Sequence, residues 1–191
     1  MESSGEVVPY LLMDIVKTFE DLGWKCELDE AGDNSCTYEL SDRIVQIVPQ
    51  KFNTGDSSRI NFNESVSSKK FNEVAVYIRG SKNYYSVESP SVDMIFTDSE
   101  ITYSDINEVS EKIIDWAKNF DLESKINELA NLPTDCKGNL AVKHLAALVI
   151  TKNIEKLNFY KNSFMSGDKL NFVPYITEDF IDRAIELCDK N

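Results

Sequence analysis

The spacing of apolar residues changes near Asp121, and this change constrains the fold more than any other feature of the sequence. Before that point, short runs typical of strands lie between two amphipathic helical patterns, and after it only helical patterns follow. Strands first and helices later are typical of an α+β protein. The sequence therefore predicts an α+β domain at residues 1–121 and a helical C-terminal extension at residues 122–191.

Two helices are expected within the first 121 residues. Apolar residues recur with helical spacing between Pro9 and Gly23, which predicts an N-terminal helix. A second amphipathic helix is expected to end near residue 120. We expect Ser104 or Asp105 to cap it, with Glu108 completing a capping box.

The segments between these helices predict a mainly antiparallel sheet of five to six strands. WKCELD and CTYELS flank the turn EAGDN and predict a hairpin, and RIVQIVPQ predicts a third strand that ends at Pro49. Residues 50–72 are rich in Ser, Asn, Lys and Gly and predict a loop with at most one edge strand. EVAVYIRG, YYSVES and VDMIFTD predict three further strands.

Four helices are expected after Asp121. The segments are LESKINELANL, NLAVKHLAALVI, NIEKLNFYKNSF and, beginning after Thr177, EDFIDRAIELC. The middle two segments predict an antiparallel helical hairpin.

The charge of the chain narrows the choice of partner. The net charge is −13, and residues 1–120 hold 22 acidic and 11 basic residues whereas residues 121–191 hold 11 and 9. A strongly negative protein repels nucleic acid and anionic lipid. We therefore expect another protein as the partner, and neither nucleic acid nor a membrane. The acidic first part is either a solvated face or a docking surface for a basic partner.

The compartment is inferred from the start of the chain and from its cysteines. The sequence opens without a basic leader and contains no run of about 18 apolar residues, so we expect a cytoplasmic protein. Its four cysteines are expected to be reduced thiols. Cys26 and Cys36 can face each other across the predicted hairpin, and the sequence leaves their pairing open.

The sequence offers little evidence of catalysis. His144 is the single histidine and lies on a nearly apolar helix, so we expect a core residue, and a metal site with two histidines is excluded. Cys136 lies near a helix start and could pair with His144 as nucleophile and base, which is the alternative if the protein is an enzyme. No nucleotide-binding or hydrolase motif is present. We expect no enzymatic activity, no metal and no cofactor.

Two groups of residues are candidates for contact with a partner. Three acidic residues at the tip of the first hairpin form either a solvated turn or a charged contact, and they lack the spacing of a calcium loop: Asp29, Glu30 and Asp33. Four aromatic residues of the predicted sheet either cover its core or act as exposed anchors: Phe62, Tyr77, Tyr84 and Tyr85.

The segment LLMDIVKTFEDLGWKCELDEAGDNSCTYELSD resembles the start of the bacterial type III secretion chaperones. In that family an amphipathic helix with a late Leu-Gly pair leads into a hairpin of the form L-x-D-x-x-G-x-x-x-C-x-x-x-[LI]. The matching positions here are Leu22, Gly23, Leu28, Asp29, Gly32, Cys36 and Leu40. A closing helix like INEVSEKIIDWAKNF also ends that fold, and an acidic pI is usual. The resemblance covers residues 8–120 and leaves the helical region after them unmatched.

The resemblance implies a chaperone-like protein whose sheet and helix faces hold a segment of a client polypeptide. Such chaperones dimerise through a middle helix, for which residues 50–72 offer no counterpart, and this argues against a homodimer. The alternative function is that of an acidic immunity or inhibitor protein that neutralises a basic toxin.

Overall fold

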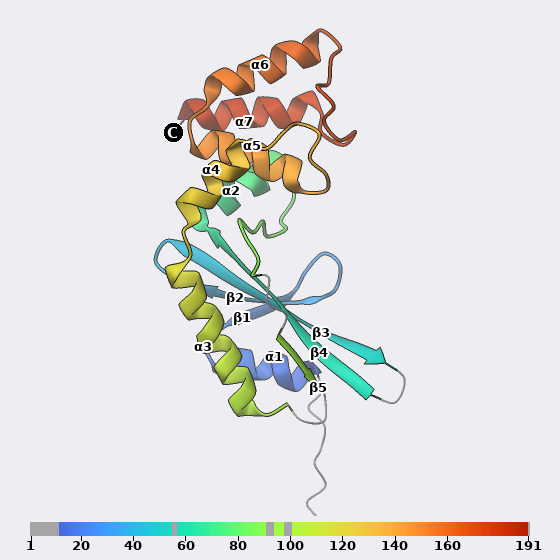
Figure 1. Ribbon diagram of the computed structural model, residues 1–191, viewed down its shortest axis with the longest axis vertical. Helices are drawn as coiled ribbons and strands as arrows, with labels where there is room; N and C mark the ends of the chain where they lie inside the picture. The colour runs from blue at the N-terminus through green and yellow to red at the C-terminus, as the bar shows by residue number, and fades with distance from the viewer. Residues whose placement is uncertain (1–11, 55–56, 91–93, 98–100, 191) are drawn as a thin grey trace, which may run out of the picture. The chain divides into compact units, whose positions relative to one another are not determined.

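The computed structural model describes residues 12–54, 57–90, 94–97 and 101–190 and divides the chain into two compact units (Figure 1). Unit 1 comprises Met1–Val66 and Ser89–Phe120, and unit 2 comprises Ser67–Glu88 and Asp121–Asn191. Each unit has its own core and is described by itself.

Unit 1 is built around a five-stranded sheet, as the sequence predicted. The strands follow one another in the order β1-β2-β3-β4-β5, and the registered pairs are antiparallel. With the two helices of the unit, the elements are α1 (Leu12–Asp21), β1 (Lys25–Leu28), β2 (Asn34–Glu39), β3 (Arg43–Thr54), β4 (Ser57–Ser68), β5 (Met94–Thr97) and α3 (Tyr103–Asn119). The α+β class is confirmed.

The two helices of unit 1 pack together on the sheet. α1 contacts α3 and the first three strands, and α3 contacts β3. The ring of Phe19 in α1 meets the rings of Trp24 and Phe62 at centroid distances of 5.5 and 5.8 Å. The indole N–H of Trp24 donates to the hydroxyl of Ser110 in α3 at 2.8 Å. The hydrophobic core of unit 1 therefore lies between the helices and the strands.

α3 begins two or three residues earlier than predicted. Its N-cap is Thr102, whose hydroxyl accepts from the amide of Asp105, while the Asp105 carboxylate accepts from the amide of Thr102 at 2.8 Å. Asp105 therefore completes the capping box instead of starting the helix, and Glu108 has no part in it.

The prediction for residues 50–72 was wrong, because most of this stretch belongs to the long strands β3 and β4. β3 continues through Pro49, since its registered pairing with β2 stops at Ile47 and the missing N–H of Pro49 falls beyond that ladder. In β4, alternate residues from Ile60 to Val66 are buried, but Glu64 among them is a carboxylate. Because Glu64 is an acidic residue at a buried position, the apolar residues of this segment do not alternate regularly, and the sequence did not indicate a strand.

The sheet carries hydrogen-bonded polar side chains at the positions that alternate with its core residues. Gln46 donates to Ser35 at 2.8 Å and accepts from Ser65 at 3.2 Å, and Asn63 donates to Gln50 at 2.9 Å. Ser35 and Ser65 are buried. The same alternate positions of β3 also carry Ile44, Val48 and the exposed Phe52, so this face is mixed in character.

Unit 2 is a helical unit with α5 at its centre. α5 contacts all the other helices of the unit, and every residue from Ala141 to Val149 is buried. A helix that is buried on all sides has no polar face, which explains its nearly continuous apolar sequence. The elements are α2 (Lys69–Arg79), α4 (Leu122–Ala130), α5 (Leu140–Ile150), α6 (Ile154–Met165) and α7 (Glu178–Lys190). The four helices expected after Asp121 are confirmed.

The strand predicted from EVAVYIRG is instead the helix α2. Its N-cap Ser68 accepts from the amide of Phe71 at 3.0 Å, and Gly80 ends the helix with φ 70°. The buried residues are Phe71, Val74, Ala75 and Ile78, which is helical spacing. YYSVES forms no strand, whereas VDMIFTD contains β5 within its described residues.

The expected boundary near residue 121 coincides with a boundary between the units, but unit 2 also includes residues 67–88. The apolar face of α2 packs against α5 and α7. The chain therefore has a helix, α2, between β4 and β5, and other helices of the same chain cover its apolar face.

Candidate functional site

The acidic tip of the β1–β2 hairpin is a self-supporting turn. Oδ1 of Asp29 accepts from the amides of Ala31 at 2.8 Å and Asp33 at 2.9 Å, and Gly32 takes φ 87°. Asp29 thus shapes the turn, as Asp commonly does. Glu30 and Asp33 are exposed, and the described residues contain no group of His, Cys, Asp or Glu that could hold a metal ion.

β1 is an edge strand of the sheet, and its pairing decides which backbone groups face outward. Asp29 N–H bonds to Asp33 C=O at 2.9 Å, and in the same register Cys26 and Leu28 occupy alternate positions opposite Cys36 and Asn34. In an antiparallel ladder these alternate positions point their N–H and C=O groups away from the partner strand. The N–H and C=O groups of Cys26 and Leu28 therefore point away from β2.

A disulfide joins β1 to β2. Cys26 and Cys36 lie directly opposite each other and are bonded, with their Cα atoms 4.0 Å apart. The expectation of four reduced thiols was therefore wrong for this pair, because the hairpin register places both cysteines on the same side of the sheet. Cys136 and Cys188 are free and buried.

The four candidate aromatic residues do not form one surface. Phe62 is only 1% exposed in the core of unit 1, and Tyr85 is 8% exposed in unit 2, where its amide donates to Asn72. Tyr84 is half-buried, and Tyr77 is 42% exposed on α2. Phe62 and Tyr85 are core residues, so only Tyr77 retains the exposure that an anchor needs.

Tyr77 already has a partner within unit 2. Its hydroxyl donates to a carboxylate oxygen of Glu186 in α7 at 2.8 Å. The residue therefore contributes to the contact between α2 and α7, and its role as an anchor for another protein stays a prediction.

His144 and Cys136 lack the features of a nucleophile and its base. The Nδ1 of His144 lies 2.8 Å from the carbonyl of Leu129, so it carries the proton, and Nε2 accepts from the hydroxyl of Tyr160 at 2.9 Å. Burial lowers the pKa of His144 to about 4 and raises the pKa of the Cys136 thiol. The imidazole is neutral with both nitrogens engaged, and the thiol keeps its proton.

The same helix contains a buried lysine, Lys143, which was not among the candidate residues predicted from the sequence. Lys143 is buried in α5, where its ammonium donates to the hydroxyl of Ser86 at 3.1 Å, and burial lowers its pKa. Nearby, Lys125 forms an ion pair with Glu88 at 2.7 Å. These contacts fasten residues 86–88 to the helices of unit 2. The sequence signal that could have indicated this buried lysine is a charged residue within a nearly apolar helical segment.

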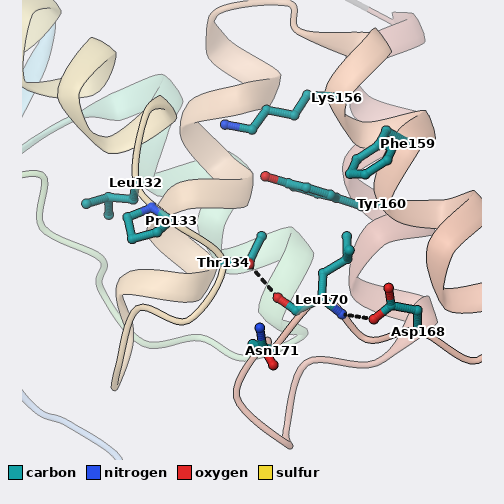
Figure 2. Close-up of a pocket in the computed structure, with 9 residues that line it drawn as sticks. All are labelled: Leu132, Pro133, Thr134, Lys156, Phe159, Tyr160, Asp168, Leu170 and Asn171. Atoms are coloured by element: carbon teal, nitrogen blue, oxygen red, sulfur yellow. Dashed lines mark hydrogen bonds between the residues drawn. The ribbon is translucent and has the colours of Figure 1, made fainter.

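A pocket of about 430 Å³ opens on unit 2 (Figure 2). It is formed by the segment that follows α4, by α6, and by the segment that follows α6. Apolar and aromatic side chains make up much of its lining, together with one lysine and one aspartate. Its size falls in the range of small-molecule sites. No sequence motif predicted this pocket, because its lining residues come from three separate segments.

Among the residues that the structure describes, no helix has both the length and the apolar composition needed to cross a membrane.

The comparisons with known proteins leave the function open. No curated protein and no solved structure gives a significant match. One family model matches residues 12–189, which includes nearly all of both units. Its description is a family of unknown function, DUF6990. Since the match extends over far more than half of the sequence, the chain belongs to the DUF6990 family.

Proposed function

We propose that this protein is a binding protein that holds an extended segment of a partner polypeptide along the outer edge of β1. The single observation that carries the proposal is the edge itself. β1 is the first strand in the sheet order, and the N–H and C=O groups of Cys26 and Leu28 point away from β2. An extended peptide can add to such an edge by pairing with these groups.

Side chains beside the edge support this assignment. Leu28 is 68% exposed and is the apolar residue of β1 nearest the hairpin tip, so it offers a contact for one side chain of the added segment. Glu30 and Asp33 are exposed in the turn that follows Leu28 and favour a segment that carries basic residues, while the carboxylate of Glu27 pairs with Lys25 at 3.1 Å. This mode of binding is close to what the resemblance to secretion chaperones implies.

A proline substitution tests the edge directly. In Leu28→Pro the outward N–H is lost, but the pairing of β1 with β2 does not use that N–H, so the fold should be retained. Leu28→Ala is the matched control, because it removes the side chain and keeps the N–H. A partner recovered by the wild-type protein should bind Leu28→Ala moderately more weakly and should lose most of its affinity for Leu28→Pro.

Binding can be measured by titration calorimetry, with the amide signals of Cys26 and Leu28 followed by NMR. Equal affinity of the partner for Leu28→Pro and the wild-type protein, with both folded, would show that the edge is not the binding site.

The second candidate function is neutralisation of a basic toxin, which the excess of acidic residues in residues 1–120 favours. In that case affinity should depend on charge more than on the edge. Replacing Glu30 and Asp33 by Lys should then weaken binding strongly and reduce the loss of affinity that added salt causes, whereas Leu28→Pro should change little.

Light scattering in solution addresses self-association. We propose a monomer, because α5 and α7 of the same chain cover the apolar face of α2. If two copies instead pair through their β1 edges, Leu28→Pro should make that dimer dissociate.

A further inference from the structure

The lining of the pocket on unit 2 combines an apolar wall with a lysine, Lys156. Figure 2 shows the rings of Phe159 and Tyr160 on α6 and, across the pocket, Leu132 and Pro133. Leu170 adds a further apolar side chain from the segment after α6. An apolar wall of this kind favours a ligand with an aromatic or branched hydrocarbon body.

Lys156 supplies the charge. Its ammonium donates to the carbonyl of Ala130 at 3.2 Å, which fixes its position and leaves two of its three N–H groups for other acceptors. In the part of the chain that the structure describes, no carboxylate forms an ion pair with Lys156. An anionic ligand would provide the missing counter-charge.

Two groups near Lys156, the Tyr160 phenol and the His144 imidazole, carry no charge that would neutralise the ammonium. Burial raises the pKa of the Tyr160 phenol to about 12, so the phenol stays protonated and donates to His144. His144 is itself neutral at pH 7, because burial lowers its pKa to about 4. The side chains of Tyr160 and His144 are therefore both uncharged at pH 7.

Asp168 limits the ligand to one negative group. Among the residues that the structure describes, it is the only other charged one that lines the pocket, and in Figure 2 it lies on the opposite side from the ammonium of Lys156. One of its oxygens accepts from the amide of Leu170 at 2.9 Å, so the carboxylate is fixed in place. A second anionic group on the ligand would face this carboxylate and be repelled.

The wall that contains Leu170 is held in an uncommon backbone conformation. Leu170 and Asn171 have φ values of 51° and 62°, a conformation that is costly for a leucine and that asparagine adopts more readily. The hydroxyl of Thr134 donates to the carbonyl of Leu170, and this bond ties the two sides of the pocket together. The pocket is therefore largely formed before a ligand enters.

We propose that this pocket binds a small monocarboxylate with an aromatic or branched apolar body, whose carboxylate pairs with Lys156 and whose body lies against Tyr160 and Phe159. This site is separate from the β1 edge, and each can fail without the other.

Three indole compounds that differ only in their polar group test the proposal. Indole-3-acetate carries a carboxylate, indole-3-acetamide is neutral, and tryptamine is cationic. By the usual affinity of a ligand of this size, indole-3-acetate should bind with a Kd on the order of 1 mM or below. The amide should bind about tenfold more weakly, and tryptamine weaker still. NMR titration should move the amide signals of Thr134, Leu170 and Asn171.

Variants of the full chain locate the site. Lys156→Met should weaken indole-3-acetate binding by about tenfold, whereas Lys156→Arg should retain it because the charge is kept. Lys169→Met is the matched control, since this exposed lysine lies near the pocket but does not line it, and it should bind as the wild type does. Benzene-1,4-dicarboxylate should bind more weakly than benzoate because of Asp168.

Several results would overturn the proposal. These are equal affinity for indole-3-acetate and its amide, unchanged binding by folded Lys156→Met, signal changes that lie outside the pocket, or no binding of any of these carboxylates at 20-fold the Kd expected above, roughly 20 mM. Leu28→Pro should bind indole-3-acetate as the wild type does, which separates this test from that of the β1 edge.

Discussion

At the scale of single residues, His144 illustrates how burial removes a chemical function that a residue type suggests. An imidazole in water is a general base near neutral pH, but this one is 0% exposed and both of its nitrogens have partners. The sequence correctly predicted a core histidine from its apolar helix. It could not identify Tyr160 and Leu129 as the partners, because these groups come from two other segments.

The lowered pKa of His144 makes stability depend on pH. The unfolded chain binds a proton at His144 near pH 6.5 and the folded chain only near pH 4, so the unfolded state holds more protons between these values. The free energy of unfolding should therefore fall as the pH drops from 6.5 to 4, by roughly 3 kcal/mol from this residue.

The contribution can be isolated with His144→Gln, whose side-chain amide can still donate to Leu129 and accept from Tyr160. Urea unfolding at several pH values should give a shallower slope for this variant between pH 6.5 and 4. Parallel curves for the two proteins would contradict the assignment.

At the scale of elements, α2 shows where local patterns are ambiguous. Val74, Val76 and Ile78 alternate as in a strand, while Phe71, Val74, Ala75 and Ile78 have helical spacing. The contacts of α2 with α5 and α7 bury the second set, and the cap at Ser68 fixes the start. Tertiary packing therefore selects the helix over the strand.

Two adjacent serines allow a matched test of this start. Ser68→Ala removes the hydroxyl that accepts from Phe71 and should lower the free energy of unfolding by about 1 kcal/mol. The hydroxyl of Ser67 is buried and has no hydrogen-bond partner in the described part of the chain, so Ser67→Ala should leave stability unchanged or raise it slightly. Guanidinium unfolding measures both. Equal losses for the two variants would mean that Ser68 is not the cap.

At the scale of the whole molecule, the two units alternate along the chain. Residues 67–88 interrupt unit 1 in the sequence and contribute α2 to unit 2. A division at residue 121 would leave α5 and α7 without the apolar face of α2. The helical region should then not be an independent domain.

Fragments test this directly. A fragment of residues 121–191 should unfold without cooperativity and bind a hydrophobic dye, because the contact of α5 with α2 is missing. Addition of a peptide of residues 67–88 should restore cooperative unfolding. If the fragment alone unfolds cooperatively by calorimetry, residues 122–191 form a domain by themselves, as the sequence suggested.

The candidate sites were predictable only in part. The acidic turn at Asp29 was found from the sequence, because turn chemistry is local. The pocket could not be found from the sequence, because Thr134, Lys156 and Leu170 are distant along the chain and no motif relates them. Phe62 and Tyr85 were placed among candidate anchors because periodicity cannot show which aromatic rings the rest of the chain covers.

The sequence by itself determined the α+β class, the helices α1 and α3 to α7, and the first hairpin, because apolar periodicity and turn residues act over a few positions. Only the tertiary structure decided that residues 69–79 are a helix, that β3 and β4 continue through polar residues, and that Cys26 bonds to Cys36. It also decided which groups line the pocket and which N–H groups of β1 point away from β2. These features depend on contacts between residues far apart in the chain, and local preferences do not encode such contacts.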